Sequence, residues 1–176
     1  DGSNYIEADN YRGVRGDTAR TIEAWIKTTT ADKEIVSWGS DVGTRKYVFR
    51  LDGSGKLRVE SNGGNVVGTT VLNDGQWHHV AAVLTGNNLQ SMVFYVDGVL
   101  DLKSGLSNQT LNTGNAFKVR VSRGVNNRYW SGQIEEVRIW SDALTQSEIE
   151  DWMYRELNAT HTSYSNLELY YPFNEG

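Results

Sequence analysis

The sequence predicts an all-β fold, a two-sheet antiparallel jelly-roll sandwich with one short C-terminal helix. Three observations support this prediction: short runs rich in β-branched and aromatic residues, turn residues between these runs, and a single stretch with helical spacing. Many strands at short spacing are typical of a sandwich or jelly roll. With 176 residues, 38% of them hydrophobic, the chain can bury one core, so we expect a single domain over residues 1–176.

The expected strands follow one another with turns between them. They cover residues 21–28, 46–51, 56–61, 77–84, 92–96, 117–122 and 133–140. Asp97 and Gly98 stand between two apolar runs, "FYV" and "VL". They predict a two-residue hairpin, because its turn needs positive φ at both central positions.

One helix is expected over residues 145–157. Thr145 can cap the free amides of the first turn, and Glu148 stands three residues later, at the capping-box position. Ile149, Trp152 and Met153 follow with helical spacing, so this side of the helix should pack on a sheet.

Alternation along the strands assigns side chains to two faces of a sheet. Tyr47, Phe49 and Leu51 share one face and are expected in the core. Arg50 and Arg58 then lie on the other face, which could hold an anionic or hydroxylated ligand. The alternative is a solvated face with cross-strand ion pairs.

Composition excludes several functions. The formal net charge of -5, without a run of basic residues, argues against a nucleic-acid partner. No apolar stretch approaches the ~20 residues of a membrane-spanning helix, so no membrane insertion is expected. The chain has no cysteine, which removes disulfides, thiol nucleophiles and thiolate metal sites. Because it begins at Asp1 without a methionine, we expect it to be excised from a larger multidomain protein.

Five segments together resemble a known family. They are TIEAWIKT, VSWGS, LNDGQWHHVAAVL, FYVDGVLD and GQIEEVRIWSDALTQSEI, in that order. They resemble the laminin G-like/pentraxin-like domains of the concanavalin A-like lectin and glucanase superfamily, and the likeness runs from DGSNYIEA to YYPFNEG. The resemblance implies a concanavalin A-like jelly roll in a secreted or surface-exposed multidomain protein. Such modules bind glycans or proteins, or pack on an enzyme domain, and many hold calcium.

The adjacent glutamates of GQIEEVRIW bear on whether the chain is an enzyme. A retaining glycosidase needs two carboxylates about 5 Å apart. In a regular strand Glu135 and Glu136 point to opposite faces, so they could not flank one glycosidic bond. His78 and His79 are neighbours on a strand in the same way. We therefore expect no catalytic residues and no enzymatic activity.

Two acids stand beside core residues in strands. Glu23 in IEAWIK and Glu136 in EEVRIW must be paired or hydrogen-bonded to be tolerated there. Arg138 and His79 are the candidate partners. We expect both acids to be structural.

Calcium is the expected metal, because oxygen ligands are abundant in the turns while cysteines and clustered histidines are lacking. By the resemblance, the candidate ligands of a structural calcium ion are Asp1, the carbonyl of Gly2 and Glu135. The family more often has aspartate at the position of Glu135. The alternatives for Glu135 are a metal-free salt bridge and a solvated carboxylate.

Ligand contacts are expected from the loops 39–47 and 123–130. Both combine arginines, asparagines and aromatics, a mixture that stacks on sugar rings and bonds their hydroxyls. The candidate ligand-binding residues are Arg45, Tyr47, Asn126, Asn127, Arg128 and Tyr129. Trp130 could instead fill the core.

The C-terminal segment LELYYPFNEG resembles one that usually opens a domain of this family. Either the chain is cut from a tandem array in a shifted phase, or the module takes an edge strand from its own C-terminus. The second explanation predicts that residues 167–173 lie beside EEVRIW. Pro172 would suit an edge strand.

Two functions remain. The first is a non-catalytic carbohydrate-binding or cell adhesion module, calcium-stabilised, whose partner is a glycan or surface glycoprotein outside the cell or at its surface. The second is a spacer or accessory domain that packs on neighbouring domains of the same chain and binds no sugar. An aromatic-lined groove at the two loops would favour the first, and a large exposed apolar patch the second.

Overall fold

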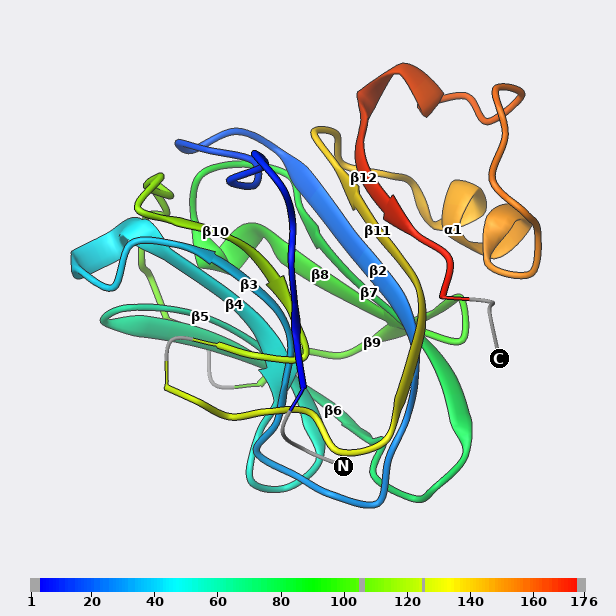
Figure 1. Ribbon diagram of the computed structural model, residues 1–176, viewed down its shortest axis with the longest axis horizontal. Coiled ribbons are helices and arrows are strands. Elements are labelled where there is room, and N and C mark those ends of the chain that lie inside the picture. The colour runs from blue at the N-terminus through cyan, green and yellow to red at the C-terminus, as the bar shows by residue number, and fades with distance from the viewer. Residues whose placement is uncertain (1–3, 105–106, 125, 174–176) are drawn as a thin grey trace.

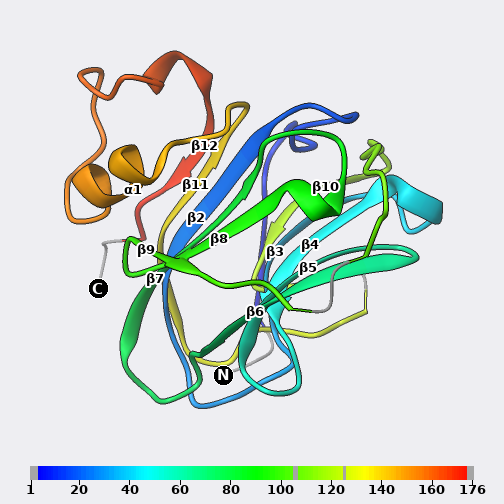
Figure 2. The ribbon, with the colours of Figure 1, turned by 180° about the vertical axis from the view of Figure 1, so that it is seen from behind.

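The chain forms a β-sandwich in a computed structural model, which describes residues 4–104, 107–124 and 126–173 (Figures 1 and 2). Two six-stranded sheets face each other, and their paired strands run antiparallel. One short α-helix follows the last long strand. The predicted fold class is therefore confirmed.

Each sheet mixes strands from both halves of the sequence. The first sheet has the order β1 (Ile6–Glu7), β10 (Phe117–Val121), β3 (Glu34–Gly39), β4 (Lys46–Leu51), β5 (Lys56–Ser61) and β6 (Gly64–Val71). The second has the order β12 (Leu167–Tyr171), β11 (Gln133–Trp140), β2 (Arg20–Lys27), β7 (Trp77–Leu84), β8 (Met92–Val96) and β9 (Val99–Asp101). The helices are α1 (Gln146–Trp152) and the 3-10 helices η1 (Gly43–Arg45), η2 (Leu89–Ser91) and η3 (Tyr164–Asn166).

The main core lies between the inner faces of the two sheets. Phe49 and Leu57 from the first sheet and Ile22 and Phe94 from the second are fully buried in it. Burying such a side chain stabilises the fold by about 1.5–3 kcal/mol. The inward orientation expected for residues 47, 49 and 51 is confirmed, and their neighbours in the strand reach the outer face.

Helix α1 lies over the outer face of the second sheet (Figure 1), with Ile149 in a second, smaller apolar cluster. The predicted capping box is present between Thr145 and Glu148. The helix ends at Trp152, earlier than predicted. Just past this end, Trp25 Nε1 donates a hydrogen bond to the carbonyl of Met153 at 2.8 Å, which satisfies one of the free carbonyls of the helix C-terminus.

Two local predictions are confirmed. Asp97 and Gly98 have φ of 52° and 78°, so the turn between β8 and β9 has positive φ at both central positions. Strand β12 pairs with β11 at the edge of the second sheet, in the register Val137 to Tyr171. The module therefore takes this edge strand from its own C-terminal segment.

Candidate functional site

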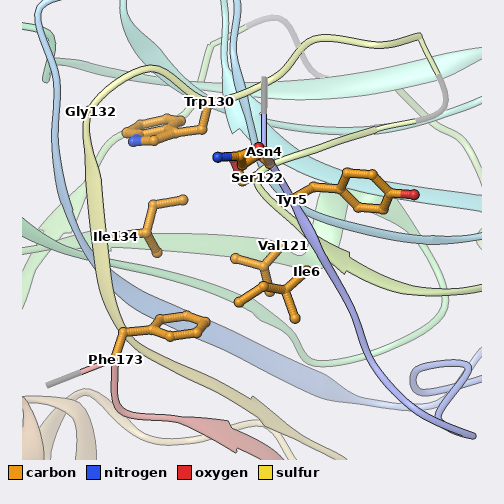
Figure 3. A pocket seen from close by; sticks show the side chains of 9 residues that line it. All are labelled: Asn4, Tyr5, Ile6, Val121, Ser122, Trp130, Gly132, Ile134 and Phe173. Carbon is orange, nitrogen blue, oxygen red and sulfur yellow. The ribbon is translucent and has the colours of Figure 1, made fainter. Parts of the chain in front are cut away.

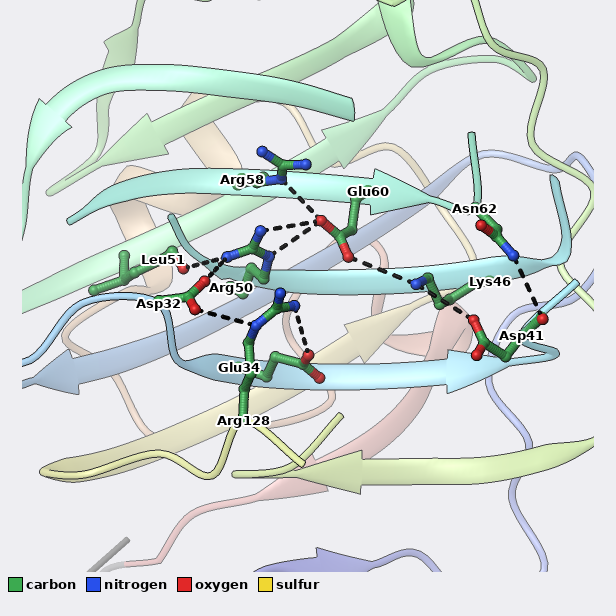
Figure 4. Close-up of polar contacts among 10 residues, drawn as sticks. All are labelled: Asp32, Glu34, Asp41, Lys46, Arg50, Leu51, Arg58, Glu60, Asn62 and Arg128. Atoms are coloured by element: carbon green, nitrogen blue, oxygen red, sulfur yellow. Dashed lines mark hydrogen bonds and ion pairs between the residues drawn. The ribbon is translucent and has the colours of Figure 1, made fainter. Parts of the chain in front are cut away.

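The outer face of the first sheet carries a network of charged side chains (Figure 4). Its centre is Glu60 on β5, which is almost fully buried. Arg50 Nη2 and Arg58 Nε lie 3.1 and 2.9 Å from one carboxylate oxygen, and Lys46 Nζ lies 3.6 Å from the other. Burial acts to raise the pKa of Glu60, but the three cations outweigh it and lower the pKa. Ion pairs across strands, one of the two expectations for this face, are present.

The loop 123–130 lies against one end of this network. Arg128 Nε is 3.2 Å from one oxygen of Asp32, whose other oxygen accepts a hydrogen bond from Arg50 Nη1 at 2.7 Å. Arg128 Nη1 also lies 3.6 Å from Glu34. One arginine thus attaches the loop to the sheet through two acids.

Glu34, at the start of β3, is fully buried, and neither of its carboxylate oxygens has a hydrogen-bond partner among the described residues. Gly124 packs directly on it, so closely that a Cβ at this position would lie 0.9 Å from Glu34 Oε2. Burial raises the pKa of Glu34 to about 7; Arg128 opposes this rise and Glu60 adds to it. The carboxyl group of Glu34 therefore changes its protonation state near neutral pH.

An exposed aromatic cluster lies beside the loop. The guanidinium of Arg123 is 4.6 Å from the ring centre of Tyr5 and 5.5 Å from that of Tyr129. The two rings meet edge to face at 6.2 Å. Arg123 Nη2 also donates a hydrogen bond to Asn127 Oδ1 at 3.0 Å. We call Tyr5, Arg123, Asn127, Arg128 and Tyr129 the rim site.

The rim site agrees only in part with the predicted ligand contacts. Asn127, Arg128 and Tyr129 belong to it, and Asn126 is exposed in the same loop. Tyr5 and Arg123 were not predicted, because no local pattern shows that residues 118 positions apart meet at the edge of β10. Strand β1 brings them together by pairing Ile6 with Val121.

The other predicted loop does not join the rim site. Arg45 lies in η1, beside Gly39 at the end of β3, whereas Arg128 contacts Glu34 at its start. A strand of this length separates the two ends by roughly 17 Å. The two loops therefore do not meet in one common groove.

Tyr47 requires a correction as a ligand contact. It is fully buried and stacks on Trp38, with 4.4 Å between the ring centres. Because it takes the inward position of β4, its ring belongs to the core and does not reach a ligand on the outer face.

An apolar pocket of about 230 Å³ opens beneath the rim site, at one side of the sandwich (Figure 3). Ile6 and Val121 line it from the first sheet, and Ile134 from the second; Phe173, just beyond β12, also lines it. Trp130 closes one end and is almost fully buried, as expected if it fills the core.

Strand β11 contains a β-bulge that overturns one prediction. Glu135 pairs with Trp25 and Arg138 with Glu23, so two residues, Glu136 and Val137, stand opposite one residue of β2. Glu136 takes the extra position, with φ of 52°. Both Glu135 and Glu136 consequently line one groove on the outer face of the second sheet. The expectation that they face opposite sides is wrong, because it assumed a regular strand.

The acids expected to be structural are paired. Trp140 Nε1 donates a hydrogen bond to Glu23 at 3.1 Å, while His79 and Arg138 lie 3.4 and 3.5 Å from its carboxylate. Burial acts to raise the pKa of Glu23, but the hydrogen bond and charge of His79, with Arg138, outweigh it and lower the pKa.

Glu136 is held by two side chains as well. Arg138 Nη2 donates to it at 2.7 Å, and the hydroxyl of Tyr170 lies 2.8 and 2.9 Å from its two oxygens. Burial and the bond to Glu136 raise the pKa of Tyr170 to about 12. The carboxylate of Glu136 is therefore occupied by a cation and a hydroxyl donor.

Of the three predicted calcium ligands, the structure describes only Glu135. Asp1 and Gly2 lie outside the described residues. Glu135 faces the groove beside Trp25, while Asn4, the first residue described, lines the apolar pocket between the sheets. Residues 4–104, 107–124 and 126–173 contain no group of three histidine or acidic side chains that could hold a metal ion. Calcium remains a prediction.

Within the described part of the chain, no helix has the length and apolar character needed to cross a membrane.

The sequence matches a family model described as the concanavalin A-like lectin/glucanases superfamily over residues 1–150. No protein with a curated description matches it significantly. Among solved structures, a proposed carbohydrate-binding protein from Bacteroides ovatus ATCC 8483 is 23% identical, with a TM-score of 0.71 over 96% of this chain. The chain spans about half of that protein, 48% of its length.

Two further structures share the fold. CBM40 of the Ruminococcus gnavus IT-sialidase, solved with α2,3-sialyllactose, is 14% identical with a TM-score of 0.61, covering 84% of this chain and 95% of the module. Domains LG4-5 of the mouse laminin α1 chain are 18% identical with a TM-score of 0.57, covering 82% of this chain and 44% of theirs.

Proposed function

Because the chain belongs to the concanavalin A-like lectin/glucanases superfamily, as its laminin G-like motifs predict, we propose that it is a non-catalytic carbohydrate-binding module of a secreted or cell-surface multidomain protein. The observation that carries this proposal is the rim site, where two tyrosine rings, two arginines and an asparagine lie together at the surface. The Bacteroides and Ruminococcus structures, described as carbohydrate-binding, support it.

The chemistry of the rim site suits a glycan. A sugar ring can stack its C–H face on an exposed tyrosine, and Tyr5 is 41% exposed. Arg123 and Arg128 are half-buried, and each guanidinium carries five N–H donors, so the atoms that reach the surface can donate to hydroxyls or to a carboxylate. Two guanidinium groups favour a glycan that carries acidic residues.

The groove glutamates do not argue for hydrolysis, although they share one face. A glycosidase needs one carboxyl group that donates a proton and a second that attacks or activates water. Arg138 and Tyr170 already occupy the carboxylate of Glu136. The non-catalytic assignment rests on this pairing.

Calcium is part of the proposal as a stabilising ion held by Asp1, Gly2 and Glu135. An ion that binds only the folded state raises the melting temperature, and the rise is larger when the ion binds more tightly. We expect calcium to raise the melting temperature, EGTA to lower it and Glu135→Gln to abolish the difference. An unchanged melting temperature in EGTA would remove calcium from the proposal.

The direct test of glycan binding is a glycan array followed by calorimetry with the best acidic oligosaccharide found. We expect Tyr5→Ala and Arg128→Ala each to weaken binding by about fivefold or more. Tyr164→Ala is the matched control, since Tyr164 is 40% exposed and lies in η3, away from the loop. Absence of any glycan ligand, or equal affinity of the rim variants and the control, would refute the proposed site.

A second candidate function is that of an accessory domain packing on a neighbouring domain. The observation in its favour is an apolar edge at β9, where Val99, Leu100 and Leu102 are 64%, 51% and 68% exposed. If this edge packs on a neighbouring domain, hydrogen exchange of the amides of Val99, Leu100 and Leu102 should be slower in the multidomain protein than in the isolated chain. Equal exchange in both would exclude this edge as a domain contact.

A further inference from the structure

The groove on the outer face of the second sheet has a volume of about 520 Å³ and lies at the end of α1. It is formed by β2, β7 and β11 together with the segment that follows the helix. Three aromatic rings, three carboxylates and one guanidinium line it, together with Met153: Trp25, Trp77, Tyr154, Glu135, Glu136, Glu156 and Arg155. We call it the helix-side groove. None of its residues belongs to the rim site.

The register of the sheet places the aromatic rings together. Trp25 on β2 pairs with His79 on β7, and Trp77 stands two residues earlier on the same face. The two tryptophans are therefore diagonal neighbours across adjacent strands, within reach of each other's rings. Tyr154, which is 74% exposed, adds a third ring, 5.3 Å from that of Trp25.

Trp25 is held in a fixed orientation. Its Nε1 donates to the carbonyl of Met153, and its ring meets that of His79 edge to face at 5.5 Å. A ring held in this way can receive a ligand with little loss of side-chain entropy. The groove is thus built before a ligand arrives.

The bulge in β11 brings the carboxylates to the aromatic rings. Glu136 is bound by Arg138 and Tyr170, as described above. Glu135, directly across from Trp25, forms no hydrogen bond or ion pair within the described residues. It therefore offers the groove a free negative charge and free hydrogen-bond acceptors.

We propose that the helix-side groove is a second glycan-binding site, for pyranose chains that are neutral or carry amino groups. The apolar face of a pyranose stacks on the aromatic rings, and its hydroxyls donate hydrogen bonds to Glu135. A protonated amino group gains further from the carboxylate and from the faces of the tryptophans. Acidic sugars are disfavoured, because the three carboxylates of the groove outnumber its one cation, Arg155. The groove and the arginines of the rim site therefore select different glycans.

The two sites lie on opposite outer faces of the sandwich, so both can be filled at once. One copy of the chain then joins two glycan strands, which raises its apparent affinity for an insoluble polysaccharide. This inference goes beyond the proposed function and does not depend on glycan binding at the rim, because the two glycan sites share no residue. Glu135 is also the proposed calcium ligand, so binding in the groove is measured in EGTA, which leaves this carboxylate free of calcium.

Calorimetry and tryptophan fluorescence with three tetrasaccharides test the proposal: β-1,4-linked glucosamine, β-1,4-linked glucose and α-1,4-linked galacturonate. We expect the glucosamine oligomer to bind more tightly than the glucose oligomer, and the galacturonate oligomer not to bind in the groove. Trp77→Ala should weaken binding of both ligands by at least about fivefold, and Tyr154→Ala should act in the same direction. Glu135→Gln should remove the preference for glucosamine while leaving the glucose oligomer bound.

The controls separate this site from the rim site and from unfolding. Tyr5→Ala should leave glucosamine binding unchanged, while Trp77→Ala should leave binding of an acidic glycan at the rim unchanged. Tyr154→Ala and Glu135→Gln change exposed or half-exposed side chains, so their melting temperatures, compared with that of the unchanged chain in EGTA, report whether the fold is intact. The proposal is overturned if neither the glucosamine nor the glucose oligomer binds. It is also overturned if Trp77→Ala binds both oligomers as tightly as the unchanged chain and Glu135→Gln keeps the preference for glucosamine. A preference for galacturonate that survives Tyr5→Ala would also overturn it.

Discussion

The carboxylate of Glu34 lies 3.6 Å from the guanidinium of Arg128, yet it has no hydrogen-bond partner among the residues described. An ion pair at this distance, covered by the backbone at Gly124, compensates burial only in part. The pKa of Glu34 is therefore raised to about 7, even though a cation stands beside it.

This raised pKa predicts how stability depends on pH. The unfolded chain releases the proton of Glu34 near its ordinary value, below the pKa of the folded state, so this residue makes folding less favourable as pH rises through that interval. Above pH 7 the full penalty applies, roughly 3 kcal/mol. Glu34→Gln should therefore raise the free energy of unfolding at pH 8 and have little effect at pH 4.5. Denaturant unfolding at both values, with Glu168→Gln as an exposed control, measures this; equal gains at the two pH values would contradict it.

Gly124 is expected to tolerate no side chain while Glu34 is present. A methyl group there would overlap the carboxylate, so Gly124→Ala should lower the free energy of unfolding by roughly 1–3 kcal/mol. Gly53→Ala is the matched control, because no atom lies within 4 Å of the added methyl group. If the overlap is the cause, combining Gly124→Ala with Glu34→Ala should cost less than the two changes separately. Additive effects would point to another origin.

Among the acids of the first sheet, Glu60 is the one whose replacement is expected to lower the free energy of unfolding the most. Its removal leaves Lys46, Arg50 and Arg58 close together and without their shared carboxylate, at a cost of about 3–5 kcal/mol. Glu60→Gln should show this loss in urea unfolding. Glu7→Gln, which breaks a more exposed pair with Arg120, should change stability by no more than about 1 kcal/mol. Similar losses from both variants would show that the buried network is not special.

The capping box of α1 can be tested by Thr145→Ala. The variant loses the side-chain acceptor for Glu148 N, so we expect a loss of about 1 kcal/mol. Thermal unfolding measures it. Ser147→Ala, inside the same helix, is the control and should cost less; the reverse order would argue that the cap contributes little.

The sequence predicts the fold well where one face of a strand is apolar and the other polar. Strands β4, β5, β7, β8 and β11 have the bounds that alternation predicts. Strand β6 was not predicted, because Gly64, Asn65 and Gly68 weaken its local preference; it forms because β5 supplies a partner.

The candidate site was harder to predict, because it depends on contacts between distant segments and on one irregular residue. The loop 123–130 has the composition of a binding loop, but its partner Tyr5 is brought to it only by the pairing of β1 with β10. Tyr47 shows the opposite case: its strand position assigned it to the core, and its composition-based assignment as a ligand contact was wrong. The bulge at Glu136 did leave one trace in the sequence. Ile134 and Val137 both point inward although they are three positions apart, which breaks the alternation of a regular strand.

The bulge in β11 also has a genetic consequence. Deleting the single codon for residue 136 would leave Ile134 inward, Glu135 outward, Val137 inward and Arg138 outward, which is a regular strand with the same core. The fold does not need the extra residue to fill its interior. A one-codon change could therefore rework the surface chemistry of this sheet without a new core having to evolve.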